Sequence, residues 1–413
     1  MMGRLFALLA WVTLALVGPV AHAQSDPIAR GLAVQAKALA TPVTYMGNVA
    51  TRSNVPNATI GTTGRQMMTR SLHFARDNLA AGCRIGIPNW YVSTGGVETG
   101  TGAPTQVHVA IENAAGAIIA EVKWNGSATG SVADLTTGWS DPLTALSIPR
   151  GSKFFIRVYR SSTVGLAYLS GGVNTVGDGF ESGASGISDK VLSGTVTAAT
   201  GGILFAPYFV CPTQVATIGI IGDSKAVGAL DTSDNNADVG ILARSIGATN
   251  GYINTARTGD TMQAYVGSHA RRAELMSYVS HILFEYGIND FAAGRTSAQM
   301  AANLSAIIGY FPDKPIWVTT ITPKTTSSDS FATTANQTVT ANENNRSTYN
   351  DALRSGTLAG VSGQIAGIID IDRIVADPVA AAKWVVGYTV DGTHENTRAS
   401  IAVQSSKVVP TFR

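Results

Sequence analysis

The sequence predicts an α/β protein built from two regions of different architecture. Residues 41–212 carry short runs rich in Val, Ile, Tyr and Phe between Gly- and Ser-rich turns, without a helical repeat. That pattern favours an antiparallel β-sandwich of the jelly-roll type. Residues 213–413 instead alternate apolar runs of five to eight residues with helical stretches, which indicates a parallel sheet with helices on both faces.

The individual elements follow from the same periodicities. In the first region we expect strands at residues 106–112, 118–124, 154–159 and 203–210, with turns at 93–96, 171–172 and 183–186. In the second region we expect five strands at residues 217–221, 251–255, 281–286, 315–321 and 364–371. Helices are expected between or after them at residues 238–246, 267–280, 297–310, 342–355 and 397–408. Sites in such sheets lie beyond the carboxyl ends of the strands.

The amino terminus has the features of a signal peptide spanning residues 1–23. Arg4 supplies a positive charge, residues 5–16 are almost wholly apolar, and Ala21-His22-Ala23 offers a cleavage site. A membrane anchor is the alternative, but the apolar run is shorter than the ~20 residues that a spanning helix needs. We therefore expect an exported protein, periplasmic, cell-surface or extracellular, with no stable membrane insertion after cleavage.

Cysteine content and charge restrict the other classes of function. Export favours a disulfide between Cys83 and Cys211, the two cysteines of the chain, with two buried thiols as the alternative. No HExxH, CxxC or GxGxxG spacing occurs in a suitable context, so we predict no metal site and no cofactor. The formal net charge is +2 without a Lys/Arg run, which argues against binding nucleic acid.

The first candidate for chemistry is Ser224. A buried strand is predicted to run directly into Gly222-Asp223-Ser224, which would expose the serine hydroxyl at the carboxyl edge of the sheet. Taken alone the tripeptide is weak evidence, because Gly, Asp and Ser form many turns.

The second candidate is the pair Asp391 and His394. A serine nucleophile needs a base, and the base needs an acceptor that orients its other ring nitrogen. An Asp three residues before a His can supply both from one loop. Of the six histidines, His394 is the one expected in a polar loop after the last strand. A solvated loop histidine is the alternative interpretation.

Four motifs in order resemble the blocks of SGNH/GDSL hydrolases. They are Gly222-Asp223-Ser224, Gly259 within residues 256–260, Gly287-Ile288-Asn289-Asp290, and Asp391-Gly392-Thr393-His394. The resemblance covers residues 215–413, about half of the chain, and implies a three-layer α/β/α, flavodoxin-like domain. It also implies a serine ester hydrolase in which Ser224 is the nucleophile.

The resemblance implies a role for each remaining site residue. His394 would be general base and then general acid, and Asp391 would hold its ring. The oxyanion would be bound by the backbone N–H groups of Ser224 and Gly259 and by the side-chain amide of Asn289. A plain turn glycine and a loop-capping amide are the alternatives for Gly259 and Asn289.

Two residues beside the nucleophile need separate expectations. Where the family pattern has Leu, this chain has Lys225, which we expect to face solvent, with a substrate contact as the alternative. Asp223 is expected to stabilise the turn, since Asp391 fits the triad better.

Other candidate sites were weighed against ordinary structural roles. The chain has no Gly-x-Ser-x-Gly elbow. Asp370 and Asp372 could form a two-carboxylate glycosidase site, although polar residues commonly end a strand. Aromatic candidates for sugar stacking are Trp90, Tyr91, Trp124 and Trp139. At strand spacing we expect these side chains in the core.

We therefore expect a secreted serine esterase that hydrolyses O-acetyl esters, with an acetylated polysaccharide as substrate and residues 41–212 as a carbohydrate-binding or accessory module. The alternatives are a lipase or arylesterase on small or lipid esters, and a non-catalytic binding or adhesion protein. Every candidate catalytic residue lies within residues 213–413. We thus expect a chain beginning near Pro212 to keep its sheet and cleave small esters.

Overall fold

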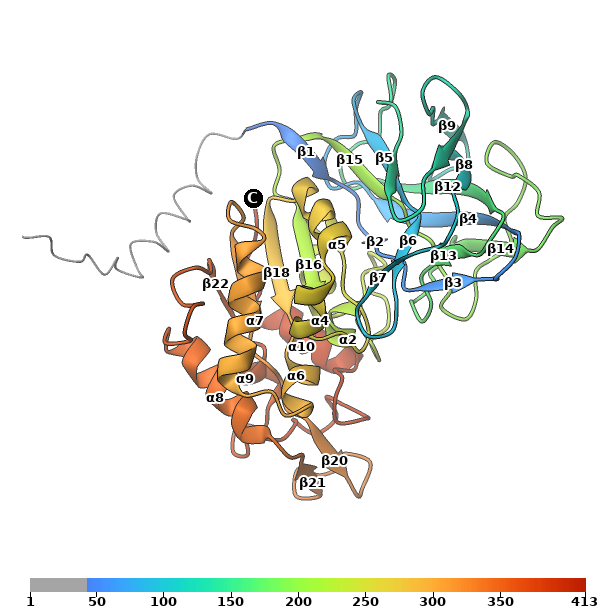
Figure 1. Ribbon diagram of the computed structural model, residues 1–413. Coiled ribbons are helices and arrows are strands. Elements are labelled where there is room, and N and C mark those ends of the chain that lie inside the picture. The colour runs from blue at the N-terminus through green and yellow to red at the C-terminus, as the bar shows by residue number, and fades with distance from the viewer. Residues whose placement is uncertain (1–42) are drawn as a thin grey trace, which may run out of the picture.

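The computed structural model describes residues 43–413, which form two regions side by side (Figure 1). The predicted signal peptide lies outside the described residues. The carboxyl-terminal region is a six-stranded parallel sheet, whose strands run in the order β2 (Ser53–Asn54), β17 (Tyr252–Asn254), β16 (Ile218–Gly222), β18 (His281–Glu285), β19 (Ile316–Thr319) and β22 (Gly367–Ile369). The predicted parallel sheet is confirmed.

Helices cover both faces of this sheet, with α5 and α7 in front and α10 behind in Figure 1. One face packs against α2 (Ser224–Val227), α3 (Ile241–Ile246), α9 (Asp372–Val375) and α10 (Thr397–Ser406). The other packs against α4 (Met262–Gly267), α5 (Ala270–Leu275), the 3-10 turn η1 (Met276–Tyr278), α6 (Ile288–Ala292), α7 (Ser297–Gly309) and α8 (Glu343–Arg354). Thr296 and Gln299 form a capping box that starts α7. The helix expected at residues 267–280 begins later, because Ser268 is extended.

The sixth strand corrects the prediction of five. β2 comes from the amino-terminal region and pairs in parallel with β17, Ser53 opposite Ile253 and Asn54 opposite Asn254. Two residues are too few to show a periodicity, so no pattern in the sequence indicates this strand. The parallel sheet therefore takes an edge strand from across the predicted boundary at residue 212.

The amino-terminal region contains two larger antiparallel sheets. One has the order β1 (Tyr45–Asn48), β15 (Tyr208–Thr213), β5 (Arg84–Pro88) and β11 (Thr137–Trp139). The other has the order β10 (Thr129–Val132), β8 (Thr105–Asn113), β12 (Lys153–Ser162), β4 (Arg65–Phe74) and β14 (Gly179–Gly183), with β9 (Ile118–Glu121) beside β8. The smaller pairs are β3 (Ala58–Ile60) with β13 (Leu166–Tyr168), β6 (Trp90–Val92) with β7 (Glu98–Gly100), and β20 (Thr325–Ser327) with β21 (Gln337–Val339) in the other region.

Both larger sheets contribute to one apolar core. Alternate residues of β12, namely Phe154, Ile156 and Val158, pack with Ile85 of β5 and Phe209 of β15. The mixed α/β architecture is thus confirmed, while the jelly-roll-type β-sandwich of the amino-terminal region stays a prediction. The strand expected at residues 203–210 begins only at β15, after Pro207, whose nitrogen cannot donate to a ladder.

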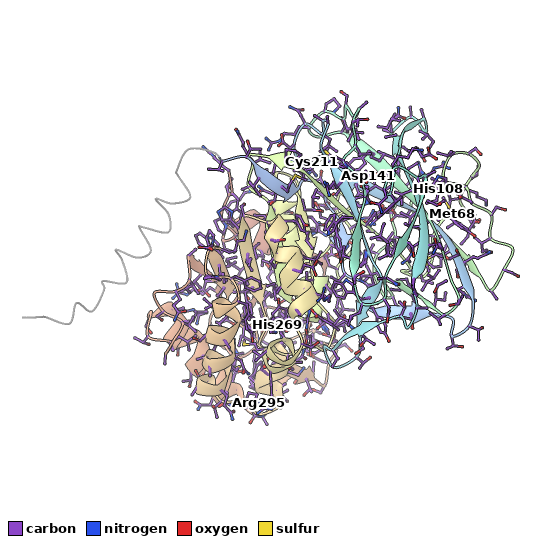
Figure 2. The ribbon with its side chains drawn as sticks, turned by 45° about the horizontal axis from the view of Figure 1, so that its top comes forward. Met68, His108, Asp141, Cys211, His269 and Arg295 are labelled. Carbon is purple, nitrogen blue, oxygen red and sulfur yellow. A yellow bond between two sulfur atoms is a disulfide. The ribbon has the colours of Figure 1, made fainter. Side chains whose placement is uncertain are left out.

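A disulfide joins Cys83 to Cys211 in this core, as predicted, with the two Cα atoms 4.0 Å apart. Figure 2 labels Cys211 and, farther into the antiparallel region, His108 and Met68. The aromatic candidates mostly serve the interior. Trp90 and Trp124 are buried, and Trp139 packs against Tyr278 with ring centroids 4.5 Å apart.

The two regions also share side chains in one hydrophobic cluster. Trp90 and Tyr208 of the antiparallel region, both fully buried, pack in the same core as Met262 and Tyr265 of α4. Among residues 43–413, no helix has the length and apolar character needed to cross a bilayer. The boundary near residue 212 therefore divides the sequence without dividing this core.

Candidate active site

The nucleophile candidate lies at the end of the central strand β16. Gly222 closes the strand, and a Cβ there would be 2.7 Å from the Glu285 carbonyl oxygen, so the close packing requires glycine. The Asp223 carboxylate accepts the Lys225 N–H at 3.0 Å and caps α2, the turn-stabilising role that was expected. Ser224 is the first residue of this helix, and 3% of its surface is exposed.

The histidine loop brings its side chains onto this serine. The His394 Nε2 atom lies 2.8 Å from the Ser224 Oγ, and its Nδ1 atom lies 2.6 Å from the Asp391 Oδ2. Asp391 Oδ1 also accepts the backbone N–H groups of Thr393 and His394, both at 2.8 Å. When the His394 Nδ1–H donates to Asp391, Nε2 is free to accept the serine proton. The structure therefore places all three predicted triad residues together.

Charge at the triad is concentrated on Asp391. Partial burial alone would raise the pKa of its carboxyl, but hydrogen bonds from the His394 ring and from the His394 and Thr393 backbone outweigh burial and hold that pKa well below its usual range. The carboxylate is thus ionised at neutral pH and can stabilise a protonated imidazole.

A hairpin that the sequence did not reveal supports this loop. Gly392 has a φ of 74°, and a Cβ on it would be 1.9 Å from the carbonyl oxygen of Thr325 in β20. The Gly392 carbonyl accepts the Thr325 N–H at 2.9 Å and the Trp384 indole N–H at 3.1 Å. The β20–β21 pair therefore fixes the loop between Asp391 and His394.

The two further donor candidates follow β17 and β18: Gly259 lies in a loop and Asn289 in the first turn of α6. Gly259 is exposed with a φ of 78°, and a Cβ on it would have no atom within 4 Å. Asn289 donates one amide proton to the Asp260 carbonyl at 2.9 Å, which leaves its other proton for a ligand. The amide thus ties the start of α6 to the Gly259 loop, and both the oxyanion-donor and the loop-capping interpretation of Asn289 fit this geometry.

Lys225 differs from the expectation that it faces solvent. Only 4% of it is exposed; its ammonium forms an ion pair with Glu395 and donates to the Thr393 carbonyl at 3.2 Å. It also lies 5.0 Å from the Trp384 ring centroid. The residue after Ser224 is therefore bonded to both neighbours of His394. No local pattern reveals this, since Glu395 is 170 positions away.

Buried carboxyl groups lie beneath the nucleophile. Glu285 is buried, and neither of its carboxylate oxygens has a hydrogen-bond partner within residues 43–413. Burial, followed by repulsion from Glu395, raises the pKa of Glu285 well above its usual value. Burial also raises the pKa of Asp223 to about 8. In both groups burial therefore favours the neutral, protonated carboxyl.

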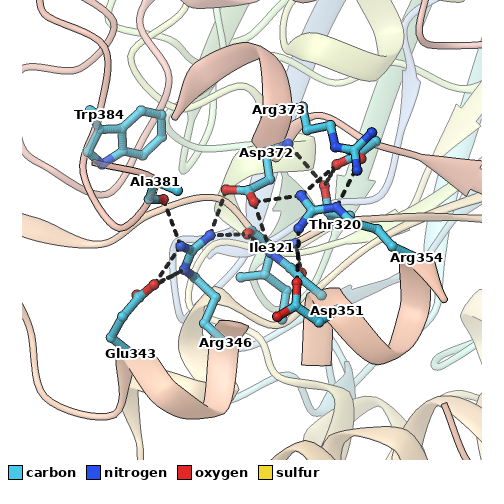
Figure 3. A network of polar contacts seen from close by, with 12 residues as sticks. Thr320, Ile321, Glu343, Arg346, Asp351, Arg354, Asp372, Arg373, Ala381 and Trp384 are labelled. Atoms are coloured by element: carbon cyan, nitrogen blue, oxygen red, sulfur yellow. Dashed lines mark hydrogen bonds and ion pairs between the residues drawn. The ribbon is translucent and has the colours of Figure 1, made fainter. Parts of the chain in front are cut away.

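The two carboxylates of the alternative glycosidase site form ion pairs with arginine side chains. Asp370 and Asp372 both bind Arg354 Nη2, at 2.8 and 2.7 Å, and Asp372 also binds Arg346 Nη1 at 2.6 Å (Figure 3). This network joins α8 to the end of β22, so the expected structural role is confirmed. No cluster of His, Cys, Asp or Glu among the described residues could hold a metal ion.

Comparisons with known proteins give structural likeness only. No protein-family model and no curated protein matches the sequence. A solved lipolytic protein of the G-D-S-L family from Desulfitobacterium hafniense is 12% identical, covers 47% of this chain and 99% of its own, and gives a TM-score of 0.36. A carbohydrate acetylesterase from Sinorhizobium meliloti is also 12% identical, covering 47% and 96% with a TM-score of 0.33.

A further solved structure, described as a platelet activating factor from Streptococcus pneumonia, is 19% identical, covers 47% of this chain and 82% of its own, and gives a TM-score of 0.34. At these identities and TM-scores the likenesses carry no argument about activity. One of these solved structures carries in its description the G-D-S-L family, which the four motifs of this chain resemble.

Proposed function

We propose that the protein is a serine ester hydrolase that works through an acyl-enzyme. The observation that carries this proposal is the unbroken line from the Asp391 carboxylate through the His394 ring to the Ser224 hydroxyl, with 2.6 and 2.8 Å contacts. A hydroxyl next to a neutral imidazole, itself oriented by a carboxylate, is the arrangement that activates serine for attack on a carbonyl.

In this mechanism His394 accepts the Ser224 proton as the oxygen attacks the ester carbonyl. The tetrahedral oxyanion is bound by the N–H groups of Ser224 and Gly259 and by the free amide proton of Asn289. The protonated imidazole then gives its proton to the departing alcohol, leaving an acyl group on Ser224. Water, deprotonated by His394, hydrolyses that ester and restores the serine.

For the substrate we propose O-acetyl esters, with an acetylated polysaccharide as the natural source and the antiparallel half as a β-sandwich accessory module. The choice of an acetylated polysaccharide follows the resemblance, seen in the sequence, of an exported esterase preceded by a β-rich region to enzymes that remove acyl groups from polysaccharides. Export from the cell is also proposed. The Cys83–Cys211 disulfide supports it, because disulfides persist in oxidising compartments.

Replacing the nucleophile tests the reaction. Ser224→Ala should lower kcat for p-nitrophenyl acetate by at least ~10³-fold and abolish labelling by a fluorophosphonate probe. Ser400→Ala is the matched control, since Ser400 is a buried serine of α10 whose hydroxyl has no partner within residues 43–413. Labelling and turnover that survive in Ser224→Ala would refute the assignment.

The acyl group and the polymer are tested separately. An acyl-chain series of p-nitrophenyl esters should show highest kcat/KM for acetate, and acetate should be released from one or more acetylated glycans. A preference for long acyl chains would instead favour a lipase.

A further inference from the structure

The hairpin β6–β7 belongs to the amino-terminal region by sequence but forms a sheet of its own between the two regions (Figure 1). Trp90 at its open end and Val92 beside its turn are fully buried in the core that contains α4. At the turn end, where Glu98 pairs with Val92, the Glu98 N–H donates to the Ser268 hydroxyl at 2.8 Å. The hairpin is thus anchored to the carboxyl-terminal half at both ends.

Glu98 is the centre of a buried ionic network. Its two carboxylate oxygens accept the backbone N–H groups of Arg271 at 2.7 Å and Arg272 at 2.8 Å, at the start of α5. Oε1 also accepts the Arg272 Nε–H at 3.3 Å. The Arg272 side chain is fully buried and forms an ion pair with Asp260, Nη1 to Oδ2, at 2.6 Å. Its Nη2 donates to the Gly96 carbonyl at 2.9 Å.

Asp260 connects this network to both donor candidates. It follows Gly259 directly, and its own carbonyl accepts the Asn289 amide. Its carboxylate also accepts the Tyr286 hydroxyl at 2.7 Å. Gly96 of the hairpin turn lies so close that a Cβ on it would be 2.1 Å from Asp260 Oδ1.

Gly259 itself has no side chain with which to fix its loop, and its N–H can serve an oxyanion only if it is positioned before charge develops. We infer that Glu98 and Arg272 are positioning residues for the oxyanion hole, through which the amino-terminal hairpin holds the Gly259 and Asn289 donors in place. This inference rests on the proposed ester hydrolysis. If so, the antiparallel half helps to position the groups that stabilise the transition state.

An isosteric substitution that removes the negative charge of Glu98 tests the inference. In Glu98→Gln, an NH₂ group replaces one of the two carboxylate oxygens, each of which accepts a backbone N–H in the parent protein. Two donors then face each other, so the start of α5 and Arg272 shift. We expect kcat for p-nitrophenyl acetate to fall 10- to 100-fold, the scale of effect that a misplacement of about 1 Å produces. KM should change less than about threefold, because the loss is in the transition state.

Glu112→Gln is the matched control. The Glu112 carboxylate is also buried and accepts from two arginines, Arg70 and Arg157, inside the antiparallel region. Loss of the Glu112 negative charge should lower thermal stability but leave kcat unchanged at temperatures where the protein is folded. An equal fall in kcat in both variants, or none in Glu98→Gln, would overturn the inference.

A second pair of variants needs no loss of buried charge. Gly95 and Gly96 both have positive φ, 91° and 80°, so alanine strains the backbone at either position. A Cβ at Gly95 meets nothing within 4 Å, whereas one at Gly96 meets Asp260. Gly96→Ala should therefore lower kcat at least tenfold relative to Gly95→Ala; equal values would contradict the inference. If the parent chain neither hydrolyses esters nor reacts with a fluorophosphonate, the proposed function itself has failed.

Discussion

The two halves of the chain contribute different things to the same site. The groups proposed to touch substrate, from Ser224 to His394, lie at one edge of the parallel sheet. The antiparallel half supplies none of them, yet it provides the edge strand β2, core side chains such as Trp90, and the hairpin that reaches Asp260. Separation of motifs along a sequence therefore does not make the motif-free half dispensable.

The largest expected effect tests this dependence directly. A chain beginning at Pro212 loses β2, which pairs with β17, and loses Trp90 and Tyr208 from the shared core. We expect it to lack a cooperative unfolding transition and to have no activity on small or polymeric esters, because apolar surface on α4 becomes exposed. Circular dichroism on heating measures the unfolding transition, and turnover of p-nitrophenyl acetate measures the activity.

This outcome differs from the expectation based on motif positions alone, that the carboxyl-terminal half works by itself. Co-expression with residues 43–211 is the control, since supplying the missing half should restore solubility and turnover. A soluble, active fragment would show that the interface contributes little and that the first half is a separate module.

A smaller effect distinguishes an asparagine proposed to bind the oxyanion from an asparagine that only stabilises the fold. Asn289→Ala removes a proposed oxyanion donor and should lower kcat by roughly 10²–10³-fold with little change in KM. Asn57→Ala is its counterpart in the antiparallel half, where the amide donates to the Ser170 carbonyl at 2.9 Å, as Asn289 donates to Asp260. The counterpart should lose stability and keep its kcat. A large rise in KM at constant kcat would mark Asn289 as a substrate-binding residue instead.

The sequence predicted what is local and missed what is distant. The apolar run into Ser224 and the Asp391–His394 spacing each lie within one segment, so periodicity and chemistry identify them. Strand β2 has two residues and no periodicity of its own. The turn at residues 93–96 was expected, but its contact with Asp260 depends on tertiary packing.

Lys225 shows the same limit from within the site. A lysine after a turn is ordinarily solvated, and its burial here is offset by the ion pair with Glu395 and the hydrogen bond to the Thr393 carbonyl. Such long-range pairing cannot be inferred from spacing in a single sequence.

The smallest expected effect concerns one buried carboxyl group in each half. The contributions of these two groups to stability should change with pH in opposite directions. Burial raises the pKa of Asp223 to about 8, against about 3.9 in the unfolded chain. Between about pH 4 and pH 8 the folded state therefore holds more protons at this group, and its contribution to stability falls as pH rises. For Asp178, burial would raise the pKa, but attraction to Arg52 outweighs burial and lowers it.

The contribution of Asp178 is therefore present above the unfolded pKa and is lost as pH falls through the folded value. Asp223→Asn keeps a good capping residue for α2. Its free energy of unfolding minus that of the parent should rise by at least ~1 kcal/mol from pH 5 to pH 8. Asp178→Asn should lose stability at pH 7 and lose less at pH 3, since the parent carboxylate is then nearing protonation. Urea unfolding midpoints across this pH range measure both differences. Parallel curves for Asp223→Asn and the parent would show that Asp223 is ionised in the folded protein at neutral pH, and that the charge beneath Ser224 is larger than its burial implies.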